Sequence, residues 1–112
     1  MPTHKIMQIV ASESTPDKEE EFSRWYSDVH LPMLFGCQGV KRASRYQLIG
    51  NDVKKNAKFL AIYEFDSLKD MDAFPDSQAY KNAIEDFEEN HEALGFNMRW
   101  VAAYECITEL ER

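Results

Sequence analysis

Glycine is scarce in this sequence, with four residues in 112, and no two of them form a glycine-rich motif. Phosphate loops and dinucleotide-binding turns need several glycines at fixed spacing, so the common nucleotide-binding motifs are excluded. Histidine and cysteine are equally rare: His4, His30, His91, Cys37 and Cys106 are all that the chain has. They show no HxH, HExxH or CxxC spacing, so we expect no metal, no cofactor and no disulfide framework.

Positive charge and long apolar runs are also lacking. Lysine and arginine number 13 against 20 aspartate and glutamate, and the resulting net charge of −7 argues against a nucleic-acid partner. No stretch reaches the roughly 18 apolar residues of a membrane span, and residues 1–5 lack the apolar run of a secretory signal. We therefore expect a cytoplasmic protein without a membrane partner. The length and 44% hydrophobic residues predict one domain over residues 1–112.

The spacing of apolar residues predicts two βαβ-like halves, in the order βαββαβ. Strands are predicted at 5–11, 40–49, 57–65 and 97–108, a first helix from 16 to about 31, and a long second helix over 76–94. Thr15 is a natural N-cap for the first helix, and Pro32 should end or kink it. Ser67 should cap a short helix before Pro75, and Gly95 should close the last helix.

The segment 57–65 is apolar on both faces, which is typical of a central strand. In the neighbouring strand, alternation places Val40, Tyr46 and Leu48 on one face and Ala43, Arg45 and Ile49 on the other. The element order predicts an α+β, ferredoxin-like fold, a four-stranded antiparallel sheet with its helices on one face. Because the other face would then be bare, we predict a homodimer through the sheet faces.

The run from Trp25 to Pro32 reads WYSDVHLP, and Gly39-Val40 and Ala43-Ser44-Arg45-Tyr46 follow it. This pattern resembles the EthD-like branch of the dimeric α/β-barrel superfamily. The resemblance implies a pocket between sheet and helices, lined by His30 with Trp25, Tyr26, Arg45 and Tyr46. It also implies a small cofactor-independent enzyme with monooxygenase, isomerase or cyclase chemistry on an aromatic, polyketide-like or lactone molecule. The alternative is a non-catalytic dimer that binds a small apolar ligand or assists a degradation or stress pathway.

His30 is the first candidate for chemistry, at the margin of the apolar face of the first helix and beside the break expected at Pro32. A neutral imidazole there is suited to take a proton from a carbon acid or phenol, and Tyr26 or Tyr46 to polarise an oxygen. The competing interpretation is that His30 bonds a free carbonyl at the broken helix. His91, on the apolar stripe of the last helix, should point at the sheet.

Other aromatic and basic residues are candidates for substrate binding. With His91 they are Trp25, Arg45, Tyr63, Trp100 and Tyr104. Aromatic rings stack on flat apolar ligands, but they are also the ordinary filling of a small core. For Arg45 and Arg99 the competing role is an ion pair across the sheet, with Glu64 and Glu105 as the expected partners.

Overall fold

The strand β3 (Phe59–Phe65) lies inside a four-stranded sheet whose order is β2-β3-β1-β4. The computed structural model describes residues 5–112, so His4 lies outside the described residues. The other strands are β1 (Ile6–Ser14), β2 (Val40–Gln47) and β4 (Phe96–Glu105). All three neighbouring pairs are antiparallel, which confirms the predicted α+β, ferredoxin-like fold.

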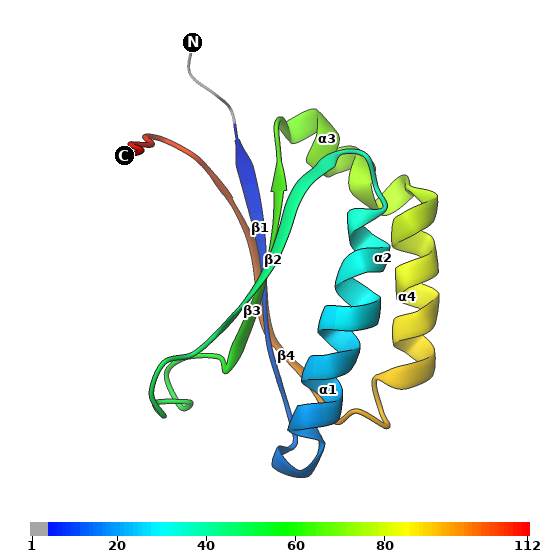
Figure 1. Ribbon diagram of the computed structural model, residues 1–112. Coiled ribbons are helices and arrows are strands. Elements are labelled where there is room, and N and C mark those ends of the chain that lie inside the picture. Colours follow the sequence, from blue (N-terminus) through cyan, green and yellow to red (C-terminus); the bar gives the residue numbers. More distant parts are fainter. Residues whose placement is uncertain (1–4) are drawn as a thin grey trace.

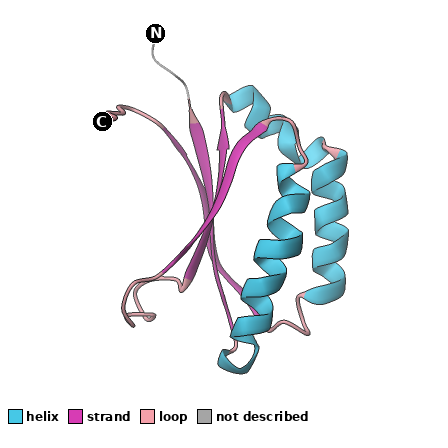
Figure 2. Ribbon diagram, in the orientation of Figure 1, coloured by secondary structure: helices cyan, strands magenta, loops and turns pink. Residues whose placement is uncertain are grey.

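The helices lie together on one face of this sheet (Figure 1). The first helical rod joins η1 (Pro16–Lys18), α1 (Glu19–Trp25), the π-helical segment η2 (Tyr26–His30) and α2 (Leu31–Phe35). The second helical segment comprises α3 (Leu68–Ala73), η3 (Phe74–Asp76) and α4 (Gln78–Asn90). Figure 2 shows the two-layer arrangement, with no helix on the opposite side of the strands. Within residues 5–112, no helix combines the length and apolar character needed to cross a bilayer.

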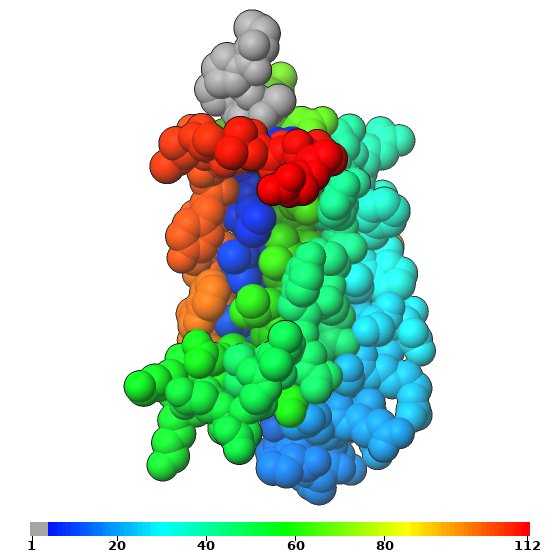
Figure 3. Space-filling view, turned by 60° about the vertical axis from the view of Figure 1, so that its left-hand side comes forward, coloured from blue at the N-terminus to red at the C-terminus, as the bar shows by residue number. Residues whose placement is uncertain are grey.

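The core fills the space between the sheet and the helices. Every second residue of β3 is buried, namely Phe59, Ala61, Tyr63 and Phe65. The alternate residues Leu60 and Ile62 point to the open face and are partly exposed. The sheet therefore has one filled face and one face that no helix covers (Figure 3). The uncovered face carries apolar side chains, as the sequence predicts.

The strand β2 differs from its predicted alternation. Its register against β3 shifts between Val40 and Arg42, because Lys41 forms an irregularity in the pairing. An extra residue in one strand turns the side chains before it to the other face. The prediction that Val40 shares a face with Tyr46 is therefore wrong: Val40 is buried under the helices, on the side of Ala43 and Arg45.

Local capping signals are mostly confirmed. The hydroxyl of Ser67 accepts from the backbone N–H of Asp70 at 3.1 Å, and Ser77 caps α4 in the same way. Gly95 has the predicted left-handed conformation, with φ of 62°. Thr15 is the exception, because its side chain makes no cap bond; its backbone carbonyl accepts from Lys18 instead.

The backbone conformation and close surroundings of Gly95 can be tested by substitution. A Cβ there would overlap the Thr15 hydroxyl, whereas one on Gly50, which also has positive φ, would meet open space. Both alanine substitutions carry a backbone strain of about 1–2 kcal/mol. We expect Gly95→Ala to lower the free energy of unfolding by clearly more than Gly50→Ala, measured by urea denaturation. Equal losses would contradict this expectation and show that the Thr15 side chain moves aside at no cost.

Candidate functional site

A π-helical turn in the first helical rod decides which side chains reach the core. The buried residues follow one another at intervals of four: Phe22, Tyr26, His30 and Leu34. In an α-helix such a row drifts around the rod, but the wider i→i+5 turn of η2 adds a residue and holds the row on one face. His30 therefore lies in the middle of the buried face rather than at its margin, and it is only 7% exposed.

The same turn explains why Pro32 does not break the helix. The rod continues through Pro32 and ends at Phe35, so the predicted end or kink near residue 32 is wrong. Pro32 lacks an N–H and crowds the carbonyl of residue 28. That carbonyl belongs to the π segment, where the α-helical hydrogen-bond register is already interrupted. A proline there costs the helix little, and it leaves His30 held by continuous helix on both sides.

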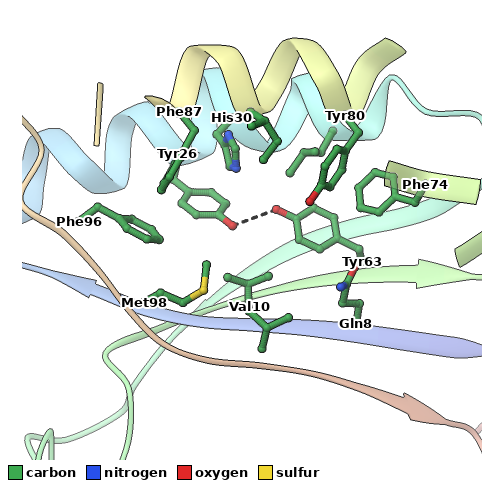
Figure 4. Close-up of a pocket in the computed structure, with 13 residues that line it drawn as sticks. Gln8, Val10, Tyr26, His30, Tyr63, Phe74, Tyr80, Phe87, Phe96 and Met98 are labelled. Atoms are coloured by element: carbon green, nitrogen blue, oxygen red, sulfur yellow. Dashed lines mark hydrogen bonds between the residues drawn. The ribbon is translucent and has the colours of Figure 1, made fainter. Parts of the chain in front are cut away.

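A cavity of about 140 Å³ lies between the helices and the sheet. Its lining comes from both layers and comprises Gln8, Val10, Tyr26, His30, Leu34, Tyr63, Phe74, Tyr80, Ile84, Phe87, Phe96, Met98 and Val101. None of these side chains is an aspartate, glutamate, lysine or arginine. Met98 and Val101, on the edge strand β4, are 49% and 44% exposed, so the cavity opens beside that strand. Figure 4 shows the polar groups of Tyr26, His30, Tyr63 and Tyr80 gathered on its helix side.

His30 enters the cavity as a neutral base. Its Nδ1 atom is buried and has no hydrogen-bond partner among residues 5–112. Burial lowers the pKa of His30 from 6.5 to about 4, and the carboxylate of Asp86 opposes this shift only in part. The predicted alternative, in which His30 bonds a carbonyl at a broken helix, finds no support because the helix is unbroken.

Trp25 fixes the plane of His30 without lining the cavity. The two rings stack, with centroids 4.8 Å apart and planes 20° apart. The indole Nε1 of Trp25 donates to Asp86 Oδ2 at 3.0 Å, which ties the first helical rod to α4. Asp86 thus positions the ring that supports His30. Sequence reasoning missed this carboxylate, because nothing distinguishes it from the other acidic residues of the last helix.

Tyr26 and Tyr63 form the second polar feature of the cavity. Their hydroxyl oxygens are 3.0 Å apart, and both side chains are buried. Burial raises the pKa of Tyr26, and it raises the pKa of Tyr63 well above 10.0, so both are neutral phenols. One hydroxyl donates to the other, and the accepting hydroxyl keeps its own O–H free for a further acceptor. The edge of the Tyr26 ring packs on His30, with ring centroids 4.9 Å apart.

Arg45 lies directly behind this pair and not in the cavity. Its guanidinium carbon is 4.8 Å from the centroid of the Tyr26 ring. Its Nη1 donates to the Ser23 carbonyl at 2.8 Å and to the Ser27 hydroxyl at 2.8 Å. The expected ion pair with Glu64 is absent, since Glu64 lies on the open face and pairs with Arg42. Arg99 does not pair with its expected partner, Glu105. Its Nη1 lies 3.3 Å from Oε2 of Glu13 instead.

Three of the predicted site residues lie away from the cavity, on the open face of the sheet. Tyr46 follows Arg45 in β2, and neighbouring strand residues point to opposite faces. Tyr46 is accordingly 57% exposed and lines a separate hollow with Leu60 and Trp100. Tyr104 lies on the same face, beside the segment after β4. The structure does not bring Tyr46, Trp100 or Tyr104 together with His30.

His91 is also outside the cavity. The helix α4 ends at Asn90, one residue before it, so His91 belongs to the turn that leads to β4. Its ring stacks on Phe87, with centroids 5.0 Å apart, and its carbonyl accepts from Phe96. His91 is half-buried and does not line the cavity beside His30, so its part in substrate binding stays a prediction.

Two uncharged polar residues complete the lining, and sequence reasoning did not assign them to a site. Gln8 lies on β1, at a position whose alternate neighbours Ile6 and Val10 are apolar. The signal in the sequence that could have identified Gln8 was a single amide side chain on the inward face of a strand. Tyr80 is part of the apolar stripe of α4, and its side chain points toward Tyr63 (Figure 4). No group of three or more His, Cys, Asp or Glu side chains in residues 5–112 is arranged to hold a metal ion.

No family model and no curated protein matches the chain. Solved structures do match. An EthD family protein from Bacillus halodurans is 12% identical, with a TM-score of 0.65 over 87% of this chain and 96% of its own. Hydroxynitrile lyase from Passiflora edulis is 14% identical, with a TM-score of 0.65 over 98% and 100%. A dimeric ferredoxin-like protein of unknown function from Thermobifida fusca is 16% identical, with a TM-score of 0.57 over 95% and 92%. At these identities the likeness confirms the fold that was expected from the EthD-like resemblance.

The low pKa of His30 generates a stability prediction. Above pH 6.5 the residue is neutral in both states, but as the pH falls toward 4 the unfolded chain binds a proton that the folded protein does not. The free energy of unfolding should therefore fall on acidification, with about 2–3 kcal/mol of the loss near pH 4.5 due to His30. Urea denaturation at pH 7 and pH 4.5 should show a smaller loss in His30→Gln than in the wild type. The same reduction in His91→Gln would contradict the assignment to His30.

Proposed function

We propose that this protein is a small enzyme that transfers a proton to or from a neutral single-ring compound in the His30 cavity. The observation that carries the proposal is an unpartnered, neutral His30 nitrogen beside the Tyr26–Tyr63 hydroxyl pair, in a cavity without charged lining residues. A base and an oxygen-polarising donor are the two parts that cofactor-independent proton transfer requires.

The size of the cavity limits the ligand. An engineered apolar cavity of about 150 Å³ binds benzene, and this cavity has about 140 Å³. A single aromatic or lactone ring therefore fits within it, while a multi-ring polyketide would extend through the opening beside Met98 and Val101. We accordingly place single-ring compounds first among the aromatic, lactone and polyketide-like molecules that the sequence resemblance implies.

The absence of charge in the lining limits the ligand further. A carboxylate or ammonium group entering the cavity would lose its hydration and find no opposite charge among the thirteen lining residues. A carbonyl or hydroxyl oxygen, in contrast, can accept from the free O–H of the tyrosine pair. The favoured substrates are therefore uncharged carbon acids, phenols, lactones or hydroxynitriles.

In the proposed reaction, the ligand oxygen accepts a hydrogen bond from the Tyr26–Tyr63 pair. A C–H or O–H bond of the ligand then breaks, its proton moves to a ring nitrogen of His30, and the electron pair stays on the ligand. The imidazolium that forms is stabilised by the new oxyanion beside it and by the carboxylate of Asp86, which already acts on His30. Trp25 keeps the imidazole ring in plane throughout.

A non-catalytic ligand-binding role is the competing function, and one observation favours it. A histidine whose pKa lies near 4 is a weak base, so proton removal from an unactivated C–H bond would be slow. In that case the cavity would store or present a small apolar molecule without changing it. Turnover separates the two functions, whereas stabilisation by a ligand is expected from both.

We also propose that the functional unit is a homodimer joined through the open sheet faces. The open face carries a row of exposed or half-exposed apolar side chains: Met7, Ile9, Tyr46, Leu60, Ile62, Trp100 and Tyr104. A contiguous apolar face of this kind is typical of an interface. The Thermobifida fusca structure, which has this fold, is described as dimeric.

Proton transfer can be tested without knowing the natural substrate. A cyclic ketone and a single-ring lactone in D2O would be followed by NMR for deuterium incorporation, and an aromatic hydroxynitrile for aldehyde release. We expect turnover of at least one compound, and a loss of about 100-fold or more in His30→Gln. Tyr63→Phe should lose about tenfold or more, because it removes a donor to the oxygen. Tyr46→Phe, on the open face, is the matched control and should keep wild-type activity.

Full turnover in a folded His30→Gln protein would refute the role of His30 as the base. Binding of the compounds without any turnover, in the wild type as well, would favour the ligand-binding function instead.

The dimer is tested by placing a charge in the middle of the open face. Ile62→Arg should convert a dimer into a monomer in light scattering after gel filtration, because an unpaired cation would be buried in the interface. Val29→Arg is the matched control, since Val29 is a 37% exposed apolar residue on the helix layer. A dimer that survives Ile62→Arg would contradict an interface through this face.

A further inference from the structure

Arg45 holds an unusual position, because its guanidinium is sandwiched among aromatic rings. Its central carbon is 4.8 Å from the ring centroid of Tyr26, 5.0 Å from that of Phe59 and 5.8 Å from that of Phe22. Nη1 is held by the oxygens of Ser23 and Ser27. Nε and Nη2 are buried and have no hydrogen-bond partner within residues 5–112.

No carboxylate among residues 5–112 pairs with this charge. The three oxygens that Arg45 contacts are a carbonyl and two hydroxyls, and all are neutral. Other arginines of the described chain do form ion pairs: Arg24 with Glu20, Arg42 with Glu64, and Arg99 with Glu13. A partly buried arginine stays charged, and burying it without a counter-charge is costly. Arg45 is thus a positive charge that its own surroundings leave unbalanced.

The charge acts on the hydroxyl pair of the cavity. Arg45 packs on the outer side of Tyr26, whose hydroxyl meets that of Tyr63 at 3.0 Å. Burial raises the pKa of both phenols. Against this rise, the hydrogen bond with Tyr63 and then the charge of Arg45 lower the pKa of Tyr26, and the charge of Arg45 lowers the pKa of Tyr63. A cation that favours negative charge at this pair also favours it, more weakly because of the greater distance, on a ligand oxygen bonded to the pair.

We propose that Arg45 is a positioning residue whose unbalanced charge, acting through Tyr26 and Tyr63, makes the cavity bind phenols and enols in their ionised form. The inference rests on the proposed function, in which a ligand oxygen meets this hydroxyl pair. The ligand arrives neutral, its O–H bond breaks, and its proton goes to His30 or to solvent. The electron pair remains on the oxygen, which accepts a hydrogen bond from the pair.

The other elements around the pair supply no second cation. The helical rod brings neutral His30, and α4 brings the Tyr80 phenol and, beyond Trp25, the Asp86 carboxylate. Neither β1 nor β4 adds a charge, since their lining residues are Gln8, Val10, Phe96, Met98 and Val101. The one lasting positive charge that faces this pair among the described residues is Arg45, on β2.

The test uses 4-nitrophenol, a neutral single-ring phenol whose ionised form absorbs visible light. The ionised fraction of free and protein-bound ligand is measured across a pH series, and binding is measured separately by calorimetry. An apolar cavity alone would make the bound phenol less ionised than the free one. We expect the reverse in the wild type, because of the hydroxyl pair and Arg45. A bound ligand that is less ionised than the free one would overturn the inference without needing any variant.

Variants then assign the effect to the charge of Arg45. Arg45→Gln should lower the ratio of ionised to neutral bound ligand about tenfold, and Arg45→Lys should restore most of it. Arg24→Gln is the matched control, since it removes the same charge from the exposed side of α1 and should leave the ratio unchanged. An unchanged ratio in Arg45→Gln would refute the role of Arg45 while leaving the proposed function intact. Failure of the wild type to bind the phenol would refute both.

Discussion

The π-helical turn at Tyr26–His30 is the constraint on which the site depends. It keeps Phe22, Tyr26, His30 and Leu34 on one side of the rod, where a regular α-helix would carry the last two away from the sheet. Because a π turn inserts a residue into a helix, it is less stable than an α turn and recurs at functional sites. Here it places an imidazole in an apolar layer, and the pKa of His30 falls because burial disfavours the charged ring.

The electrostatics of the site depend on where the charged groups lie around the cavity. The cavity lining is uncharged, but a cation lies on the far side of Tyr26 and a carboxylate on the far side of Trp25. Aromatic rings therefore separate the charged groups from the ligand space on both sides. This arrangement leaves a field across the cavity that is positive toward the tyrosine pair. Such a field favours proton transfer from a ligand to His30 only if the ligand's oxygen faces the tyrosines.

The sequence predicts much of the fold because the governing signals are local. The two-sided apolar strand Phe59–Phe65, the cap at Ser67 and the left-handed Gly95 all depend on a few neighbouring residues, and all are confirmed. His30 and Tyr26 were also identified, although only the family resemblance distinguished them from core residues. Irregularities were not predictable in this way. The π turn and the β2 register shift each change the phase of a repeating pattern, and nothing in the composition marks either position.

The structure corrects one expectation that came from the resemblance and not from the strand alternation. Arg45 and Tyr46 were both expected at the pocket, yet a strand sends them to opposite sides of the sheet, one behind the tyrosine pair and one into the open. Asp86 was missed for a different reason: it lies 61 residues beyond Trp25 along the chain, and no local pattern links the two. A single sheet thus carries the cavity on its helical face and an apolar surface on its other face. A substitution on one face of the sheet should leave the other face unchanged only if the substituted side chain lies outside the β1–β3 core, because both faces share the backbone of these strands.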